Sequence, residues 1–285
     1  MIKDWIAEYN PTNEEETLSA LREIMQEITL AGLSRTDFVE NAAFYGGTAL
    51  RIFYNLDRFS EDLDFSLLVA EPDFTLEPYF AAVITEFEAS GIKVSIREKD
   101  KKIKSSVESA FLKSETIWKE LILEDIVKQA GIASNKSVKI KIEVDCKPPL
   151  GFHTEEKLLL RPFSFYVKCF TTSSLFAGKM HALLFRKWKN RVKGRDWYDL
   201  EWYIKKGIPL DVQHFLRRVQ DTGDWQKDSI SDQQIKQLLI DRINTVSFEQ
   251  VKEDVVRFIK DEKSLQIWNQ GYFKDLIEKL KFEHE

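Results

Sequence analysis

Hydrophobic and polar residues alternate along two stretches of the chain, and this pattern predicts two strands that each bury one face. In the first stretch, Leu63 and Phe65 alternate with Asp62 and Asp64. Successive side chains of a strand point to opposite faces, so the two aspartates project to one side while the two apolar residues face the core. The second stretch covers residues 138–146, where apolar residues alternate with charged ones.

Other segments carry apolar residues at helical spacing. Residues 14–31 predict an amphipathic helix that ends at Gly32, and residues 79–90 predict a second helix. From residue 171 onward the pattern is mainly helical, and Ser173 or Ser174 is expected to cap the first of these helices. We therefore expect strands and helices together in the first part of the chain and helices in the last part.

A glycine turn precedes the strand that carries the two aspartates. Residues 43–45 are read as the end of an apolar strand, Gly46 and Gly47 as a tight turn, and Thr48 as the N-cap of a helix. A helix start of this kind offers backbone N–H groups and a partial positive charge to a phosphate. Mg²⁺ prefers oxygen ligands and usually takes one or two carboxylates together with substrate phosphates and water. The turn and the aspartate pair together predict a metal and triphosphate site.

The composition sets the outer bounds of the prediction. The chain has 285 residues, of which 43% are hydrophobic, enough for one large domain or two modest ones. No apolar run approaches the roughly 18 residues of a membrane span, and Asp4 and Glu8 lie where a signal peptide would be basic and then apolar. We expect a cytoplasmic protein without membrane association. Cys146 and Cys169 form no C-x-x-C pattern and are interpreted as packed thiols.

The formal net charge is −5, but one stretch, residues 179–195, is strongly basic. Its basic residues are Lys179, Arg186, Lys187, Lys189, Arg191, Lys193 and Arg195. Such a stretch suits the phosphates of a nucleotide or of an RNA backbone. The alternative is a solvated helix face whose basic end complements the helix dipole. Trp188 and Trp197 could stack on a base, although aromatic residues at this spacing more often belong to a core.

Three stretches carry a family resemblance: residues 45–51 (YGGTALR), residues 58–65 (RFSEDLDF), and residues 175–200, which begin LFAGKMHALL and end KGRDWYDL. They resemble the DNA-polymerase-β-like nucleotidyltransferase superfamily and, within it, the AbiEii/AbiGii nucleotidyltransferase toxin family. The third stretch is the most specific to that family. The resemblance implies an α+β fold, in which a polymerase-β-like core with a mixed sheet and flanking helices covers residues 1–170. A helical C-terminal domain that carries the basic helix would cover residues 171–285.

The resemblance also implies roles for individual residues. Asp62 and Asp64 would hold Mg²⁺, with two ions expected, and Lys179 would contact the nucleotide phosphates. Asp196 would orient Lys179 or the substrate, whereas Asp199 is expected to cap or pair locally. The remaining residues expected to bind the nucleotide are Gly46, Gly47, Thr48, Arg51, Arg58 and Ser60. Arg51 could as easily pair on its helix surface.

Polymerase-β-like enzymes need a third carboxylate from a neighbouring strand, as general base or as a metal-bound group that orients the attacking hydroxyl. Glu143 and Asp145 share the polar face of the strand at residues 138–146. The family wording favours Glu143, and the exposed end of the strand favours Asp145. A solvated face balanced by Lys139 and Lys141 is the third interpretation.

These features predict a nucleotidyltransferase that moves a nucleoside monophosphate from a nucleoside triphosphate to an acceptor. The resemblance implies a toxin of a toxin–antitoxin or abortive-infection system, with RNA as the acceptor, the 3′ end of tRNA favoured, and an antitoxin as partner. A small-molecule nucleotidyltransferase of the antibiotic-modifying type is the first alternative. A nucleic-acid- or protein-binding module without catalysis is the second.

Overall fold

The computed structural model describes residues 2–97, 116–123, 138–186 and 192–284. It divides into two compact units, which we describe separately. The first unit comprises Met1–Tyr54, Phe59–Pro148 and Thr154–Cys169, and the second comprises Asn55–Arg58, Pro149–His153 and Phe170–Glu285. The predicted division into domains of residues 1–170 and 171–285 stays a prediction, because it concerns segments that fold independently.

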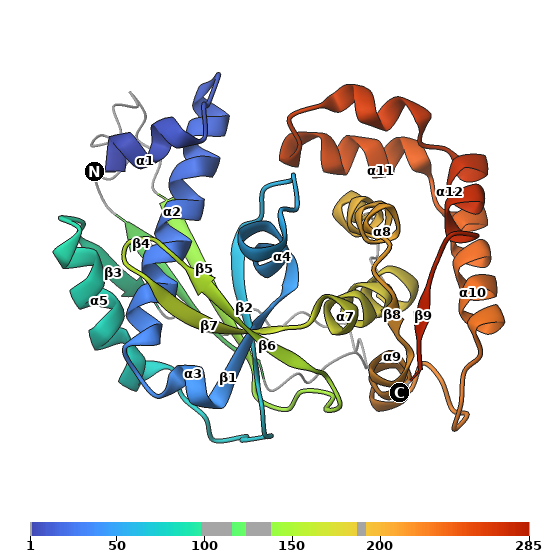
Figure 1. Ribbon diagram of the computed structural model, residues 1–285, viewed down its shortest axis with the longest axis horizontal. Helices are drawn as coiled ribbons and strands as arrows, with labels where there is room; N and C mark the ends of the chain where they lie inside the picture. The colour runs from blue at the N-terminus through green and yellow to red at the C-terminus, as the bar shows by residue number, and fades with distance from the viewer. Residues whose placement is uncertain (1, 98–115, 124–137, 187–191, 285) are drawn as a thin grey trace, which may run out of the picture. The chain divides into compact units, whose positions relative to one another are not determined.

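A mixed sheet forms the centre of the first unit (Figure 1). In the described part of the chain its order is β3-β4-β5-β2-β1-β7-β6. The strands are β1 (Ala42–Tyr45), β2 (Asp62–Leu67), β3 (Val94–Arg97), β4 (Thr116–Leu123), β5 (Val138–Asp145), β6 (Thr154–Leu159) and β7 (Phe165–Phe170). Strand β2 runs antiparallel to β1 and parallel to β5. The predicted mixed sheet with flanking helices is confirmed.

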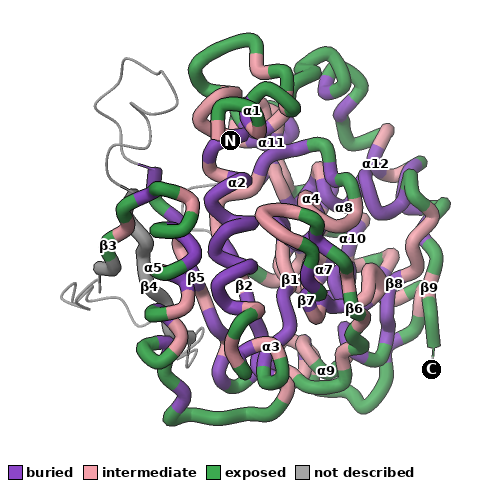
Figure 2. The backbone as a smooth tube through the Cα atoms, turned by 60° about the vertical axis from the view of Figure 1, so that its left-hand side comes forward, coloured by how far each residue is buried: buried purple, intermediate pink, exposed green. Residues whose placement is uncertain are grey.

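The alternation of apolar residues predicted the positions of β2 and β5 correctly. Leu63 and Phe65 of β2 are buried, and so are Val138, Ile140, Ile142 and Val144 of β5. Figure 2 colours the tube by burial, and along both strands buried positions recur between less buried ones. Both cysteines are buried free thiols, as predicted.

Helices flank this sheet and complete the first unit. They are α1 (Ile2–Glu8), α2 (Glu14–Ser34), α3 (Phe38–Asn41), α4 (Gly46–Tyr54) and α5 (Phe80–Ala89), with a 3₁₀ turn at Glu77–Tyr79. The Asn13 side chain caps α2 by accepting from the backbone N–H of Glu16. The predicted end of this helix at Gly32 is wrong, because α2 continues to Ser34. Gly32 serves packing instead: a Cβ there would lie 2.6 Å from Val83 Cα of α5.

Glu27 of α2 belongs to a buried cluster of polar side chains in the first unit. Arg161 Nη2 donates to Glu27 Oε1 at 2.9 Å and to the Tyr9 hydroxyl at 2.9 Å. Glu27 is 4% exposed, and its Oε2 has no hydrogen-bond partner among the described residues. Burial raises the pKa of Glu27 to about 7, although the positive charge of Arg161 opposes the shift.

We expect Glu27 to make the folded state less stable as the pH rises from about 4.5 to about 7. In this window the folded protein binds more protons at Glu27 than the unfolded chain does, so raising the pH favours unfolding. Each unit of pKa difference corresponds to about 1.4 kcal/mol of unfolding free energy. Urea denaturation of the wild type and of Glu27→Gln at about pH 5 and about pH 8 measures the effect. The wild type should lose more stability between these pH values, and equal losses would contradict the assignment.

The second unit is helical, as the periodicity of the C-terminal sequence predicts. It contains α7 (Thr172–Phe185), α8 (Gly194–Lys206), α9 (Val212–Asp221), α10 (Asp232–Thr245), α11 (Phe248–Val255) and α12 (Gln270–Ile277), 3₁₀ turns at Val256–Phe258 and Glu262–Ile267, and a parallel pair of short strands, β8 (Leu210–Asp211) and β9 (Phe282–Glu283). The predicted cap of α7 is wrong: Thr171 occupies the N-cap position, and the Ser174 hydroxyl donates to Asp211 Oδ2. Among the described helices, none combines the length and apolar character needed to cross a membrane.

Helices α8 and α11 approach each other closely at Gly194. A Cβ on Gly194 would lie 2.1 Å from Val251 O and 2.9 Å from Val255 N. The backbone N–H of Gly194 donates to Asp254 Oδ2 at 2.9 Å, so α11 caps the first turn of α8. The position therefore requires the absence of a side chain.

Gly194→Ala should lower the free energy of unfolding by about 1–3 kcal/mol, because the methyl group overpacks backbone atoms that have no room to rotate away. Gly178→Ala in α7 is the matched control, since in the described part of the chain the nearest atom outside its own helix turn would be Arg218 Cζ, at 3.8 Å from the added Cβ. The control should be neutral or gain up to about 1 kcal/mol from helix propensity. Urea denaturation compares the two variants, and equal losses would refute the packing argument.

Candidate active site

Strand β2 presents Asp62 and Asp64 on one face. Both side chains are half-buried, whereas Leu63 between them is fully buried, so the predicted alternation is present. The partner strands flank this face closely: Asp64 lies opposite Tyr45 of β1 and opposite Glu143 of β5. Asp64 is therefore held by strands on both sides, whereas Asp62 is paired with Lys141 of β5.

Gly46 provides the space that the Asp64 carboxylate occupies. Its φ is +84°, a conformation that L side chains rarely adopt. A Cβ at this position would lie 2.4 Å from Asp64 Oδ2. The glycine is therefore required twice, once by the turn from β1 into α4 and once by the carboxylate beside it.

Helix α4 begins at Gly46 and not after Thr48, so the predicted N-cap at Thr48 is wrong. Thr48 is fully buried, and its hydroxyl donates to the backbone carbonyl of Asp62. This bond ties the first turn of the helix to the first residue of β2. Because it uses the only proton of the hydroxyl, a phosphate at this turn would be bound by backbone N–H groups, which lack partners within the helix at its start.

Strand β5 brings one of the two candidate third carboxylates beside the aspartates. Glu143 is in register with Asp64, whereas Asp145 is in register with Ser66, farther along β2. Asp145 Oδ1 accepts from the backbone N–H of Lys147 at 3.1 Å. The register favours Glu143, and the choice between the two residues stays a prediction.

Lys141 lies in the same row of side chains. It is in register with Asp62 and forms an ion pair with Glu143. Burial lowers the pKa of Lys141, but its bond to Glu143 and the charges of Glu143, Asp62 and Asp64 outweigh burial and raise it. A cation thus balances part of the negative charge that these carboxylates concentrate.

Two further predicted nucleotide-binding residues lie in the first unit. Arg51 of α4 donates from Nε to Glu23 Oε2 at 2.8 Å, and its guanidinium stacks over the Phe59 ring. Ser60 is half-buried, and its backbone carbonyl accepts from Gln26 Nε2 at 3.3 Å. Arg51 is therefore engaged with a neighbouring helix, which is the alternative that the sequence left open.

Arg58 belongs to the second unit, where it pairs with Asp199 of α8. Arg58 Nε lies 2.6 Å from Asp199 Oδ1 and Arg58 Nη2 lies 2.7 Å from Oδ2, a bidentate pair with both side chains at most 1% exposed. Lys179 of α7 joins this pair, with Nζ 2.7 Å from Asp199 Oδ2 and 3.6 Å from Asp196 Oδ1. The predicted pair Lys179 and Asp196 is thus brought together, with Asp199 at its centre.

Sequence reasoning undervalued Asp199 by expecting it to cap or pair locally. Burial alone would raise its pKa, but the charges of Arg58 and Lys179 together lower the pKa of Asp199 to about 2. The signal in the sequence was the Asp-x-x-Asp spacing, which places Asp196 and Asp199 on one face of a helix.

The basic stretch is described only in part. Residues 187–191, which include Lys187, Lys189, Arg191 and Trp188, lie outside the described residues. Burial, together with the charges of Lys179, Arg186 and Arg195, lowers the pKa of Lys193 to about 8 against the attraction of Asp196. Trp197 is buried against Phe248 and Phe273, so it belongs to the core and not to a base-stacking surface.

The donor set on β2 suits Mg²⁺ bound together with a substrate. Among the described residues, no group of three or more His, Cys, Asp or Glu side chains is close enough to form a metal site from protein alone. Two hard carboxylates of one face, Asp62 and Asp64, leave the other ligand positions to phosphate oxygens and water, which is the coordination that Mg²⁺ accepts. The residues present therefore fit the predicted ion.

A sequence model of the family described as "Nucleotidyl transferase AbiEii toxin, Type IV TA system" matches residues 28–280. The chain belongs to this AbiEii family. It is therefore a nucleotidyltransferase, and a toxin of a type IV toxin–antitoxin system. The match extends across both units, so each contributes residues to the family pattern.

Two solved structures are similar to the AbiEii chain. MenT4, a nucleotidyltransferase toxin from Mycobacterium tuberculosis H37Rv, is 17% identical with a TM-score of 0.48, covering 91% of this chain and 74% of that chain. JHP933 from Helicobacter pylori is 18% identical with a TM-score of 0.45, covering 90% of this chain and 89% of that chain. A comparison with curated proteins gave no match.

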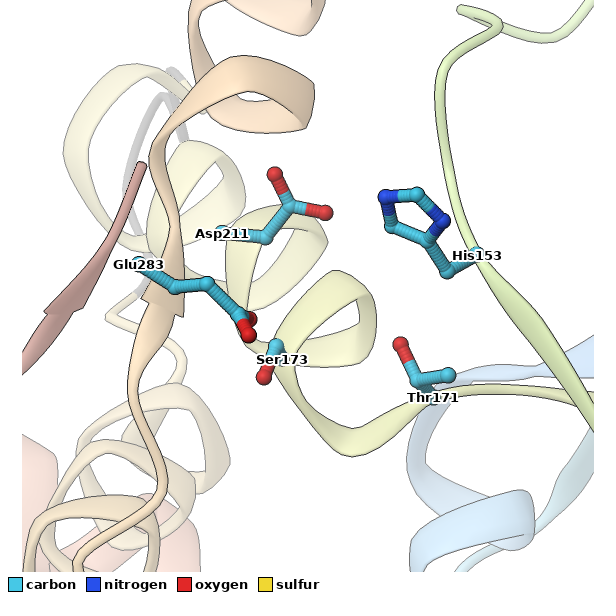
Figure 3. A pocket seen from close by; sticks show the side chains of 5 residues that line it. All are labelled: His153, Thr171, Ser173, Asp211 and Glu283. Atoms are coloured by element: carbon cyan, nitrogen blue, oxygen red, sulfur yellow. The ribbon is translucent and has the colours of Figure 1, made fainter. Parts of the chain in front are cut away.

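A polar cavity of about 170 Å³ lies within the second unit of the AbiEii chain (Figure 3). Its lining residues are His153, Thr171, Ser173, Asp211 and Glu283. Asp211 is already engaged: it accepts from the Ser174 hydroxyl at 2.8 Å and from the backbone N–H of His214 at 2.8 Å. Its carboxylate therefore caps α9 and anchors α7, and the cavity contains none of the predicted site residues.

Gly46→Ala should abolish at least about 99% of nucleotidyl transfer, because the new methyl group displaces the Asp64 carboxylate and strains the turn. Gly91→Ala is the matched control. Its φ of +73° imposes similar backbone strain, but among the described residues beyond its chain neighbours no atom lies within 4 Å of the added Cβ. A transfer assay on both folded variants tests the assignment, and equal activities would show that the contact with Asp64 is unimportant.

Proposed function

We propose that the AbiEii chain uses Asp62 and Asp64 to hold Mg²⁺, with two ions, and transfers a nucleoside monophosphate from a nucleoside triphosphate to RNA. The observation that carries this proposal is the placement of both aspartates on one face of β2, with Asp64 against Gly46 at the start of α4. Carboxylates and a helix start are the two partners that a metal-bound triphosphate needs.

Each group of the first unit then has a defined task. Backbone N–H groups at Gly46, Gly47 and Thr48 bind oxygens of the triphosphate. The acceptor hydroxyl oxygen forms a bond to the α-phosphorus, the bond from that phosphorus to the bridging oxygen breaks, and pyrophosphate leaves. Glu143 accepts the proton of the hydroxyl. Mg²⁺, when bound, lowers the pKa of the attacking hydroxyl and neutralises charge on the leaving group.

RNA is the proposed acceptor because positive charge gathers in the second unit of a chain whose net charge is −5. The charges of Lys179, Arg186 and Arg195 each lower the pKa of Lys193, so these three cations lie near Lys193. A phosphate backbone matches such a cluster better than a small neutral acceptor does. The family resemblance favours the 3′ end of tRNA, and we also propose a cognate antitoxin partner and a cytoplasmic location.

Incubation with each of the four α-³²P nucleoside triphosphates, Mg²⁺ and total tRNA should label tRNA. Asp62→Ala and Asp64→Ala should each reduce labelling at least about 100-fold, because the metal loses half of its protein ligands. Glu61→Ala is the matched control, since this neighbouring acid pairs with Arg22 at 3.8 Å and should be dispensable. Label on a small molecule or on protein would redirect the acceptor assignment, and full activity of Asp64→Ala would refute the site.

The same assay separates the two candidates for the third carboxylate. Glu143→Gln should lower labelling roughly 100-fold or more, whereas Asp145→Asn should change it by less than about threefold. Both substitutions keep the side-chain shape, and both positions lie on the polar face of β5. The reverse order of effects would assign the role to Asp145.

A further inference from the structure

Asp199 is the most buried member of the charge network in the second unit, and the proposed function gives it no task. The side-chain exposures follow a gradient, 0% for Asp199, 1% for Arg58 and 17% for Lys179. Lys179 is thus the member of this triad that reaches solvent. The two other groups are more deeply buried, as expected of residues that orient an exposed amine for binding a ligand.

The geometry leaves Lys179 held but still able to bind an anion. Arg58 occupies both oxygens of Asp199 and neutralises its charge. Lys179 shares only Oδ2, at 2.7 Å, and its distance of 3.6 Å from Asp196 Oδ1 exceeds a hydrogen bond. An ammonium has three N–H donors, so the contact with Asp199 fixes its position while other donors remain for a ligand.

The surroundings of Lys179 favour a negatively charged ligand. Lys193 adds a second cation near Lys179, since the charges of Lys179 and Asp196 both act on its pKa. A lysine paired with a carboxylate alone would lose most of its attraction for phosphate. Here the buried arginine already balances that carboxylate, so the pair with Asp199 does not cancel the charge of Lys179.

We propose that Asp199 is a positioning residue which, held by Arg58, orients the amine of Lys179 toward a phosphate group of the nucleotide. This assignment rests on the proposed function for the identity of the ligand. It replaces the predicted direct contact of Arg58 with nucleotide by an indirect role, because a guanidinium that is 1% exposed and bidentate to Asp199 is already engaged.

Isothermal titration calorimetry with inorganic triphosphate tests the proposal in the full-length protein without requiring catalysis. The four proteins are the wild type, Asp199→Asn, Lys179→Met and the double variant. If Asp199 acts through Lys179, Asp199→Asn should weaken binding at least about tenfold in the wild type but less than about twofold when Lys179 is absent. A purely structural role would give the same factor in both backgrounds.

Two further variants keep the result interpretable if Asp199→Asn unfolds the protein. Arg58→Met combined with Asp199→Asn removes both buried charges, so neither is left as an unpaired ion. Triphosphate binding by this variant is again compared with and without Lys179→Met. Asp211→Asn is the matched control: Asp211 is a buried aspartate of the same unit, 5% exposed, and it accepts hydrogen bonds from Ser174 and His214. Triphosphate affinity per folded molecule should change less than about twofold in this control.

The outcomes separate this proposal from the proposed function. Equal weakening in both backgrounds, unchanged binding in Asp199→Asn, or no binding of triphosphate by the wild type would overturn the role of Asp199. If Asp199→Asn weakens triphosphate binding only when Lys179 is present, but the protein transfers no nucleotide, the role of Asp199 is retained and the proposed function is rejected. If transfer depends on Asp64 but Asp199→Asn weakens triphosphate binding equally with and without Lys179, the proposed function is retained and the role of Asp199 is rejected.

Discussion

The contact between the Asp64 carboxylate and Gly46 is the constraint on which the first unit depends. Gly46 turns the chain from β1 into α4 with φ at +84°, and a Cβ there would lie 2.4 Å from Asp64 Oδ2. The Thr48 hydroxyl adds a bond from the same helix turn to the Asp62 carbonyl. A helix start and two carboxylates are therefore held together by backbone geometry before any ligand binds, which is the preorganisation that phosphate chemistry requires.

The second unit solves a different physical problem, the burial of charge. Asp199 and Arg58 are almost wholly removed from water, and such ions are costly unless each is paired and hydrogen-bonded. Their bidentate geometry meets this requirement, and the low pKa of Asp199, about 2, reflects it. A hydrophobic pair of similar volume would fold as well, so stability alone does not explain why these ions are present. Their link to Lys179 supplies a reason.

The sequence predicted most of the first unit because its signals are local. Alternation located β2 and β5, whereas the register between them, with Asp64 beside Glu143, came from the structure. Gly32 and Thr48 were misread for a common reason: each looked like a helix terminus, yet the first makes room for α5 and the second bonds to β2. Tertiary contacts of this kind leave no trace in spacing along the chain.

In the candidate site, too, local sequence patterns located some residues, and tertiary contacts determine others. Strand periodicity and a turn motif singled out Asp62, Asp64 and Gly46, whereas periodicity placed Glu143 and Asp145 on the same face of β5 without choosing between them. The role of Asp199 was not predictable, since Arg58 and Asp199 are 141 positions apart in the sequence. Arg58 was for the same reason assigned to nucleotide. Long-range ion pairs emerge only when the fold brings their members together.

The central claim is that the two aspartates of β2 bind the metal that carries the nucleotide. The most direct test is a crystal structure with Mn²⁺, used in place of Mg²⁺ for its anomalous signal, and a non-hydrolysable nucleoside triphosphate. The account predicts anomalous density in contact with Asp62 and Asp64 and triphosphate oxygens against the first turn of α4. Density for the metal at other residues, or triphosphate bound away from Gly46, would contradict it.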